Sequence, residues 1–335
     1  MSNFLHYIAK SKITKRNSIQ ISIPTCNSYD VTKQSIAKLY KQVGLKFDIL
    51  IIDNGSQDYH KFILDYPKIN YVVLKQNAGN SGAQRIGMEL ALKKKYKYIV
   101  CSDNDAFLLS NHGLMKLYNK IKSDKDLDCV AANHCDNLIN SDIICTKQLP
   151  FHFLFIRCDF LRKIELHNFF IFLVTEDIAF TSKIVSNGKL LLCHDVLYYH
   201  DAFKPKFLQN FTIYFGLRGF LIILFLEKNI SLNLKLYHFF HMFYYPTIAF
   251  FHSLILKDFS YIKTVLLAIF DFLTDYKKIN LINIPKNKHV FVESKKRING
   301  AVKMNTLNSI FVKKAYYWYS NFYKKNIYFR LIKNE

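Results

Sequence analysis

Glycine and proline are scarce in this sequence of 335 residues, which has 10 Gly and 6 Pro. This composition excludes collagen-like and linker-rich chains. Acidic residues are also few: 25 Asp and Glu stand against 47 Lys and Arg, which leaves a formal charge of +22. Half of the residues are apolar, so the chain is not disordered and has enough hydrophobic side chains for a sizeable core.

The seven cysteines form no Cys-x-x-Cys pair, and most of them lie in apolar or strand-like runs. We therefore expect reduced core cysteines, as in a cytosolic protein. The first 16 residues carry basic side chains but no apolar stretch like that of a signal peptide. Together these features favour a cytoplasmic protein over an exported one.

The positive charge is concentrated toward the C-terminus. Residues 1–200 hold 26 basic and 18 acidic side chains, a difference of +8, whereas residues 201–335 hold 21 and 7, a difference of +14. A basic and aromatic segment suits lipid headgroups, nucleic acid or a phosphate-bearing substrate. A lysine-rich coding bias with solvated lysines would give the same count.

Short β-rich runs alternate with amphipathic stretches in the first half, a pattern typical of a parallel α/β sheet. It predicts strands at 18–23, 47–52, 71–75 and 98–102, and helices at 32–43, 58–64 and 81–95. Farther on, it predicts helices at 112–122 and 177–187, and strands at 129–133, 151–157 and 190–199. Open α/β sheets bind ligands at the carboxyl ends of their strands, where the acidic and glycine-bearing clusters of this chain fall.

From residue 207 onward, long aromatic and aliphatic runs are interrupted by lysine. The run at 215–226 contains Arg218, and the run at 236–256 contains Pro246 and three histidines. Neither is an uninterrupted stretch of about 20 apolar residues, so helices lying in the membrane interface fit better than a spanning helix. A helical subdomain packed on the first half is the alternative. The tail at 286–335 is a further basic and aromatic element.

Two carboxylates, Asp103 and Asp105, follow the predicted strand at 98–102. Such a pair can hold Mg²⁺ or Mn²⁺ while a diphosphate completes the coordination shell. Asp53 ends another predicted strand, where its carboxylate can accept the imide N–H of a uracil or thymine base. Ordinary turn chemistry is the alternative at both places.

Taken in order, these segments resemble the family 2 glycosyltransferases of the A-type fold. The resemblance rests on PTCN at 24–27, IIDNGSQD at 51–58, NAGNSGAQRIGMELA at 77–91, SDND at 102–105, FFIFLVTED at 169–177 and the Tyr199-His200 pair. The segment from Tyr214 to Arg218 is similar to a Tyr-x-x-x-Arg segment of the rhamnosyltransferase-like and galactofuranosyltransferase-like members. The resemblance covers about residues 18–220.

The resemblance implies three sets of site residues. The nucleotide and donor set consists of Thr25, Asn27, Asp53, Asn77, Gly79, Arg85 and Asp103. The metal set, for Mn²⁺ or Mg²⁺, consists of Asp103, Asp105 and His200. The catalytic pair consists of Glu176 and Asp177, with Asp177 as the general base. A helix cap is the structural alternative for that pair.

The chain departs from the family pattern in places. Ala179 and Lys183 stand where one subset has Asp and Arg, and Gly219 stands where Asn often follows the Arg. Arg85 occupies a position that is often Asn, and it could pair with a phosphate.

We therefore expect an α/β nucleotide-binding domain followed by a helical, basic and aromatic region. The expected divisions are an N-terminal extension (1–17), a catalytic domain (18–205), a helical membrane-proximal region (206–285) and a basic tail (286–335). The resemblance implies an inverting enzyme of surface polysaccharide synthesis that moves a sugar from a UDP- or dTDP-sugar to a glycan or lipid-linked acceptor. Inverting transfer needs a base for the acceptor hydroxyl and a cation for the departing diphosphate.

We expect the enzyme to lie peripherally on the cytoplasmic face of an anionic membrane, because most of the excess charge follows the last motif. No nucleic-acid partner is expected, since an RNP-like aromatic strand is missing. The alternative is a non-catalytic membrane- or nucleic-acid-binding protein on a decayed transferase fold. A nucleotidyltransferase is disfavoured, because the chain has no Gly-rich phosphate loop followed by Lys.

Overall fold

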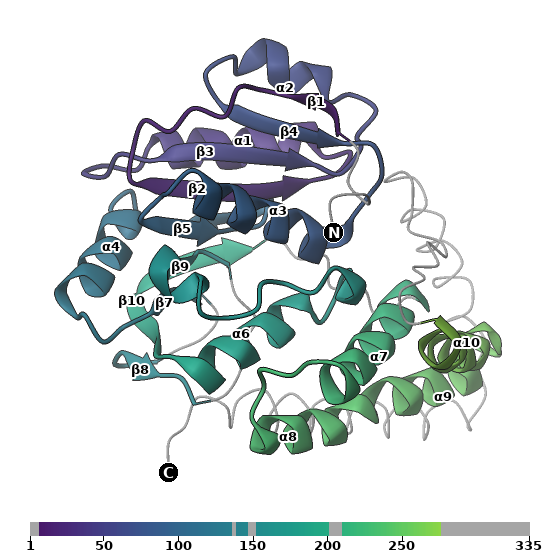
Figure 1. Cartoon of the computed structure of the whole chain (residues 1–335). Helices are drawn as coiled ribbons and strands as arrows, with labels where there is room; N and C mark the ends of the chain where they lie inside the picture. The colour runs from purple at the N-terminus through teal and green to yellow at the C-terminus, as the bar shows by residue number, and fades with distance from the viewer. Residues whose placement is uncertain (1–6, 136–138, 147–151, 201–209, 276–335) are drawn as a thin grey trace. The chain divides into compact units, whose positions relative to one another are not determined.

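The computed structural model describes residues 7–135, 139–146, 152–200 and 210–275 (Figure 1). The chain divides into two compact units. Unit 1 consists of Met1–Phe172 and Glu176–Phe203, and unit 2 consists of Leu173–Thr175 and Lys204–Glu335. The basic tail expected at 286–335 lies outside the described residues. The four divisions expected from the sequence stay a prediction.

Strands and helices alternate through unit 1 (Figure 1). The strands are β1 (Tyr7–Lys10), β2 (Ile19–Thr25), β3 (Asp48–Asp53), β4 (Asn70–Leu74), β5 (Tyr98–Cys101), β6 (Ala106–Leu108), β7 (Cys129–His134), β8 (Ile143–Ile144), β9 (Leu154–Arg157) and β10 (Leu190–His200). The helices are α1 (Tyr29–Tyr40), α2 (His60–Asp65), α3 (Gly79–Lys93), α4 (Gly113–Ser123), α5 (Cys158–Leu161), a 3₁₀ turn η1 (Phe169–Ile171) and α6 (Glu176–Asn187).

The ten strands form one mixed sheet in the order β1-β4-β3-β2-β5-β9-β7-β10-β6, with β8 also paired to β10. Strands β4, β3, β2, β5, β7 and β10 run in one direction, and β1, β9, β6 and β8 run in the other. The expected α/β fold with a mostly parallel sheet is confirmed. Each long element expected in this half is present, with bounds that differ by a few residues at its ends.

The sheet is buried on both faces, as β3 illustrates. Ile49 and Ile51 belong to the cluster that includes Ile36 of α1, whereas Leu50 and Ile52 pack in the cluster that includes Ile86 of α3. Successive side chains of a strand point to opposite faces, so an unbroken apolar run is what a strand covered by helices on both faces requires. The run DILIID of β3 is entirely buried, which meets this requirement.

Strand β1 was not expected from the sequence. The sequence predicts only an N-terminal extension here, whereas Tyr7, Ala9 and Lys10 pair antiparallel with Leu74, Val73 and Val72 of β4. This edge strand covers the outer side of β4. The sequence gives little signal for it, because a four-residue strand at an edge needs no strong apolar alternation.

The described part of unit 2 contains four helices, α7 (Asn210–Phe225), α8 (Leu232–Met242), α9 (Tyr244–Leu256) and α10 (Ser260–Asp275). Helix α7 contacts each of the other three. A Cβ added at Gly216 of α7 would lie 2.1 Å from the ring of Tyr245, so glycine allows this close packing. The stretch Leu232–Leu256 is long and apolar enough, by length and composition alone, to cross a membrane.

Candidate active site

The ends of β2 and β3 lie side by side, because Thr25 and Asp53 are paired in the parallel ladder. Asp53 is 1% exposed, and its Oδ1 accepts a hydrogen bond of 2.6 Å from the Ser56 backbone N–H. Its Oδ2 is buried and has no hydrogen-bond partner among the described residues. Burial raises the pKa of Asp53, against the hydrogen bonds from Ser56 and Gly55. A buried acceptor oxygen is therefore available at the nucleotide-binding edge predicted for the sheet.

The polar residues that follow these strands converge on the same edge. The backbone N–H of Asn27 donates to Ser56 Oγ (2.7 Å), and the side-chain amide of Asn77 donates to Cys26 Sγ (3.5 Å). Asn54 joins this turn to the start of α3: its Oδ1 accepts from Ala78 N (3.1 Å) and its amide donates to Gly79 O (3.3 Å). Four of the predicted nucleotide-binding residues, Thr25, Asn27, Asp53 and Asn77, are thus held in one connected set of loops.

Gly79 begins α3 with φ +71°, a conformation that favours glycine. A Cβ at this position would lie only 2.3 Å from the carbonyl oxygen of Phe172. The resemblance predicts that Gly79 lines the nucleotide site. The close approach of Phe172 gives a structural reason for glycine at this position as well.

Arg85 lies on α3, one side of which is buried against the sheet. Its Nε lies 2.9 Å from Glu89 Oε1, its Nη1 donates to the carbonyl of His167 (2.8 Å), and its guanidinium lies over the Phe169 ring. These contacts position the side chain on the flank of the helix. The predicted phosphate contact of Arg85 stays a prediction.

The acidic turn after β5 contacts two histidines. Asp103 Oδ2 lies 3.0 Å from His152 Nδ1, and Asp105 Oδ1 lies 3.0 Å from His200 Nε2. The antiparallel pairing of β6 with β10 places Ala106 opposite His200, which explains how residues so distant in sequence meet. The rings of the two histidines lie 4.0 Å apart.

Three of these residues could hold a metal ion, since single ligand atoms of Asp103, His152 and His200 all lie within 4.8 Å of one another. Asp103 and His200 were predicted metal ligands, and Asp105 contacts His200 directly. His152 is an addition that the sequence reading missed. Nothing in the sequence around it resembles a metal motif, and only the folded sheet brings it next to Asp103.

The charges of this cluster stabilise one another. Burial acts to raise the pKa of Asp103, but the charges of His152 and His200 and the hydrogen bonds from His152 and Asn80 lower it below its usual value. Burial acts to lower the pKa of His152, but the carboxylates of Asp103, Asp177 and Asp105 raise it overall. In the absence of a cation, an imidazolium can therefore balance these carboxylates.

Asn80 links the acidic turn to the predicted catalytic pair. Its side-chain amide donates to Asp103 Oδ1 (3.3 Å) and to Glu176 Oε1 (2.9 Å). Glu176 and Asp177 form the first turn of α6, where carboxylates are favoured by the helix dipole. Asn80 lies in the glycine-bearing segment whose resemblance was noted, but its bridging role becomes visible only in the structure.

The two carboxyl groups of the pair have distinct environments. Burial, followed by the charge of Asp177, raises the pKa of Glu176 to about 8. Burial also raises the pKa of Asp177, to about 6, while the Ile178 N–H and the charge of His152 act in the opposite direction. Because burial raises both pKa values and the charge of Asp177 raises that of Glu176 further, the pair loses its two protons in separate steps and carries a single negative charge over part of the pH range.

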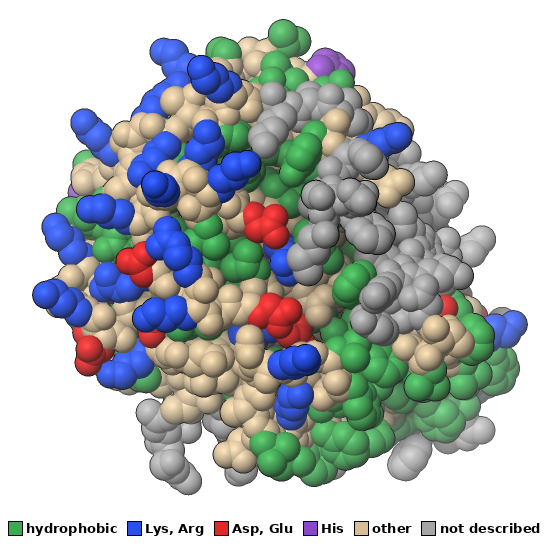
Figure 2. All heavy atoms as spheres, viewed as in Figure 1, with side chains coloured by type: hydrophobic (Ala, Val, Ile, Leu, Met, Phe, Trp, Pro, Cys, Tyr) green, Lys and Arg blue, Asp and Glu red, His purple; other side chains and the backbone are tan. Residues whose placement is uncertain are grey.

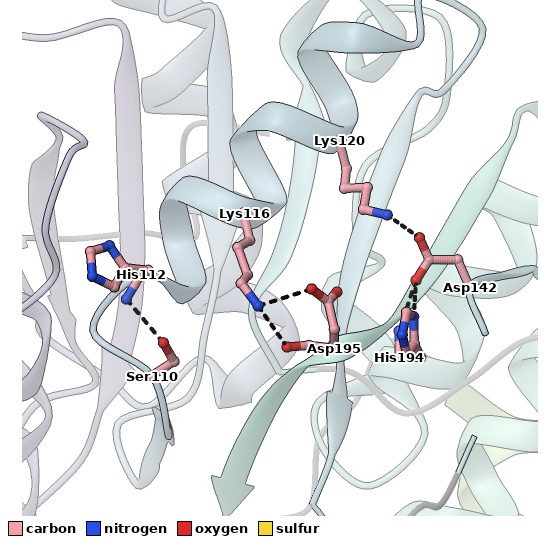
Figure 3. A network of polar contacts seen from close by, with 7 residues as sticks. All are labelled: Ser110, His112, Lys116, Lys120, Asp142, His194 and Asp195. Carbon is pink, nitrogen blue, oxygen red and sulfur yellow. Dashed lines mark hydrogen bonds and ion pairs between the residues drawn. The ribbon is translucent and has the colours of Figure 1, made fainter. Parts of the chain in front are cut away.

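A second group of possible metal ligands consists of Asp142, His194 and Asp195. Figure 3 shows both carboxylates facing lysines of α4: Lys116 Nζ lies 2.9 Å from Asp195 Oδ2, and Lys120 pairs with Asp142. His194 Nδ1 lies 2.7 Å from Asp142 Oδ1. Each carboxylate already has a cationic partner. We therefore interpret this group as a set of ion pairs that connects α4 to the irregular middle of β10.

Residues 20–173 match the family model described as glycosyl transferase family 2. This segment runs from β2 to just beyond η1, so it includes Asp53, Asp103 and Asp105, whereas Glu176, Asp177 and His200 follow it. A comparison with curated proteins gave no match.

Several solved structures share the fold. S. aureus TarS 1–349 is similar with a TM-score of 0.56 and 16% identity, over 76% of this chain and 81% of that chain. The same protein in complex with UDP-GlcNAc gives 0.56 and 15%, over 76% and 80%. Mannosyltransferase PcManGT from Pyrobaculum calidifontis, in complex with GDP-Man and Mn²⁺, gives 0.50 and 13%, over 85% and 81%. At these identities the likeness is one of fold.

Proposed function

We propose that the protein, whose residues 20–173 match the family model described as glycosyl transferase family 2, is an inverting enzyme that moves a sugar from a UDP- or dTDP-sugar to a glycan or lipid-linked acceptor. The observation that carries the proposal is the Asn80 side chain, which contacts both Asp103 and Glu176. It joins the acidic turn proposed to hold the donor to the acidic pair proposed to activate the acceptor. A transferase needs its donor site and its acceptor-activating carboxylates next to each other.

Asp177 is the proposed general base. It accepts the proton of the acceptor hydroxyl as that oxygen attacks the anomeric carbon of the donor sugar from the side opposite the leaving diphosphate. A base must be ionised at the working pH, and a pKa of about 6 allows this near neutrality while keeping Asp177 more basic than an ordinary aspartate. The charge of Asp177 raises the pKa of the neighbouring Glu176, which disfavours ionisation of both carboxyl groups at once.

Asp53 is the proposed base-recognition residue. Its buried Oδ2, which has no hydrogen-bond partner among the residues described, can accept the imide N–H of uracil or thymine. An unpaired buried acceptor is costly, and a ligand donor removes this cost when it binds. Thr25, Asn27, Asn77, Gly79 and Arg85 complete the proposed nucleotide site.

Asp103, Asp105 and His200, together with His152, are the proposed ligands of Mn²⁺ or Mg²⁺. Carboxylates suit both ions, and histidine is the commonest nitrogen ligand of metals in proteins, so these donors fit the group. When bound there, a divalent cation supplies positive charge for the departing diphosphate. The protein's own part is to fix these four side chains at the ends of β5, β9 and β10.

The finer assignment to a rhamnosyltransferase-like or galactofuranosyltransferase-like subgroup rests on Tyr214 and Arg218. In unit 2, the Tyr214 hydroxyl donates to Asp271 (2.6 Å), and Arg218 is fully buried. We also propose a place in surface polysaccharide synthesis, at the cytoplasmic face of a membrane, since the basic C-terminal region suits anionic lipid.

A donor screen tests the nucleotide half. We expect a UDP- or dTDP-sugar with Mn²⁺ to raise the melting temperature, because a ligand that binds only the folded state stabilises it. Asp53→Asn should abolish this shift, whereas Asp58→Asn, in the same turn, should retain it. Stabilisation by GDP-sugars alone would contradict the proposed base recognition.

Release of the nucleotide diphosphate tests the transferase itself. A chain that binds donor but releases no diphosphate with any glycan or lipid-linked acceptor, under Mn²⁺ or Mg²⁺, would instead be a non-catalytic protein on a decayed transferase fold. The presence of both carboxylates of the pair and both carboxylates of the acidic turn favours the enzyme.

A further inference from the structure

Unit 2 has an unusual distribution of polar and apolar side chains. Arg218, Glu227, His238, His252 and Asp271 are each less than 9% exposed. By contrast, large apolar side chains of the same helices face outward, as Figure 2 shows over α8, α9 and α10. In a water-soluble bundle, helices bury their apolar stripe and expose their polar one.

Helix α8 shows the reversal most clearly. The exposed residues Leu232, Leu236, Phe239 and Phe240 of this helix, with Phe243 directly after it, recur at helical spacing and form one apolar stripe. The opposite side, with Leu234, His238 and His241, is buried. The helix therefore directs its histidines inward and all of its leucines and phenylalanines except Leu234 outward.

The other two helices continue this pattern. In α9, Phe250 and Leu254 are exposed one turn apart, while His252 and Ser253 are buried. In α10, the exposed residues are Leu266, Ile269, Phe270 and Leu273, and Phe259 is exposed just before the helix begins. On the buried side, Asp271 accepts the hydrogen bond from Tyr214.

The exposed apolar surface is large. Thirteen side chains from Phe225 to Leu273 are between 37% and 74% exposed. An aromatic side chain has roughly 150–250 Å² of surface, so together they offer on the order of 1,000 Å². The largest apolar patch of an ordinary monomer is about 300–600 Å², so this one requires a partner.

The charges nearby identify the partner as an anionic surface. Among the acids from 210 to 274, Glu227 and Asp271 are buried and Asp258 is exposed, whereas Lys228, Lys257 and Lys263 are all exposed. The chain continues from α10 into residues 276–335, which hold 14 Lys and Arg against 2 Glu, a difference of +12. Basic residues next to a membrane are attracted to anionic lipid.

We propose that the outward apolar faces of α8, α9 and α10 dock this protein on an anionic lipid bilayer, with the three helices lying in the interface. By length alone the continuous stretch Leu232–Leu256 could span the bilayer, since 25 residues at 1.5 Å each extend about 38 Å against a hydrocarbon core of roughly 30 Å. The burial of His238, His241 and His252 on one side of this stretch, opposite a single apolar face, favours the interfacial arrangement instead. Interfacial helices place aromatic and aliphatic side chains below the headgroups and lysines among them. This proposal rests on the proposed function in one respect: the membrane is taken as the place where the enzyme meets its acceptor.

Vesicle flotation of the full chain tests the docking surface. We expect the wild type to float with vesicles of phosphatidylcholine and phosphatidylglycerol, and to float less with phosphatidylcholine alone. The double variant Phe240→Glu and Leu273→Glu should lower the partition coefficient at least about tenfold, because two buried apolar contacts are replaced by charges that anionic lipid repels. The matched control is Leu64→Glu and Leu109→Glu, which changes two exposed leucines of unit 1 and should float as the wild type does.

Three outcomes would overturn the proposal. Equal flotation of the double variant and the wild type would mean that another surface, or the chain from 276 onward alone, binds lipid. A change from dimer to monomer in the double variant, without any loss of flotation, would assign the face to a second copy. Retention of the wild type on membranes after an alkaline carbonate wash would indicate a spanning helix. Diphosphate release with a soluble acceptor is measured on the same samples, so loss of docking and absence of transferase activity are separate results.

Discussion

The burial of the Glu176 carboxyl group leads to a prediction about stability that can be tested without substrate. Its side chain is 7% exposed, and its pKa is raised from about 4.3 in an unfolded chain to about 8, by burial first and by the charge of Asp177 second. Between these two values, the folded state holds a proton that the unfolded state has lost. The contribution of Glu176 to the free energy of unfolding therefore falls as the pH rises from about 5 to 8.

The size of the effect follows from the shift. Each pKa unit corresponds to about 1.4 kcal/mol, so ionising Glu176 in the folded protein costs on the order of a few kcal/mol at pH 8. Glu176→Gln removes this cost and keeps an oxygen for the Asn80 amide. The variant should match the wild type near pH 5 and be more stable near pH 8, by a melting-temperature difference on the order of 5–15 °C.

Differential scanning fluorimetry across this pH range, with EDTA present so that no cation screens the carboxylates, measures the difference. Glu89→Gln, which removes one negative charge from a half-exposed side chain of α3, controls for net charge. The reasoning is refuted if the wild-type and Glu176→Gln melting curves stay parallel from pH 5 to 8.

Three further predictions concern the site. Asp177→Asn should lower kcat by about 10²–10⁴ while the donor Kd, measured by calorimetry, changes little; near wild-type turnover would exclude Asp177 as the base. His152→Ala should weaken Mn²⁺ binding about 10- to 100-fold in a calorimetric titration, whereas His194→Ala, in the lysine-paired group, should not; equal affinities would remove His152 from the metal site. Gly79→Ala should lower the free energy of unfolding by about 1–3 kcal/mol in a urea titration, because a Cβ would meet the Phe172 carbonyl at 2.3 Å and φ is positive; an unchanged midpoint would mean that the loop moves aside without cost.

The arrangement of the sheet could be predicted because its elements follow local periodicity. Runs such as Asp48–Asp53 are apolar throughout, and the helices between them carry their apolar residues at helical spacing. The short pieces β1, β6 and β8 were missed, since two to four residues carry too little pattern to distinguish a strand from a loop. Their positions depend on pairing with distant strands.

The candidate site could be predicted in part, for a similar reason. The predicted carboxylates lie at or just after strand ends, namely Asp53, Asp103 and Asp105. The carboxyl ends of parallel strands in an open sheet meet at one edge, independently of the loop conformations. His152 and Asn80 could not be assigned this way. The contact of His152 with Asp103 depends on the antiparallel pairing of β9 with β5, and the contact of Asn80 with Glu176 joins residues 96 positions apart.

The C-terminal helices show what composition alone cannot decide. A segment rich in Phe, Leu and Lys is expected both for a helix buried in a protein and for one at a lipid interface. The deciding feature is which side of the helix is exposed, and that depends on packing against α7. His238 and Asp271 are directed inward, and Phe240 and Leu273 are directed outward. The interior of the bundle also holds apolar side chains such as Phe215 and Ile222, so the distinguishing feature of these helices is their apolar exterior. That exterior supports the proposed lipid partner in a way that the count of lysines could not.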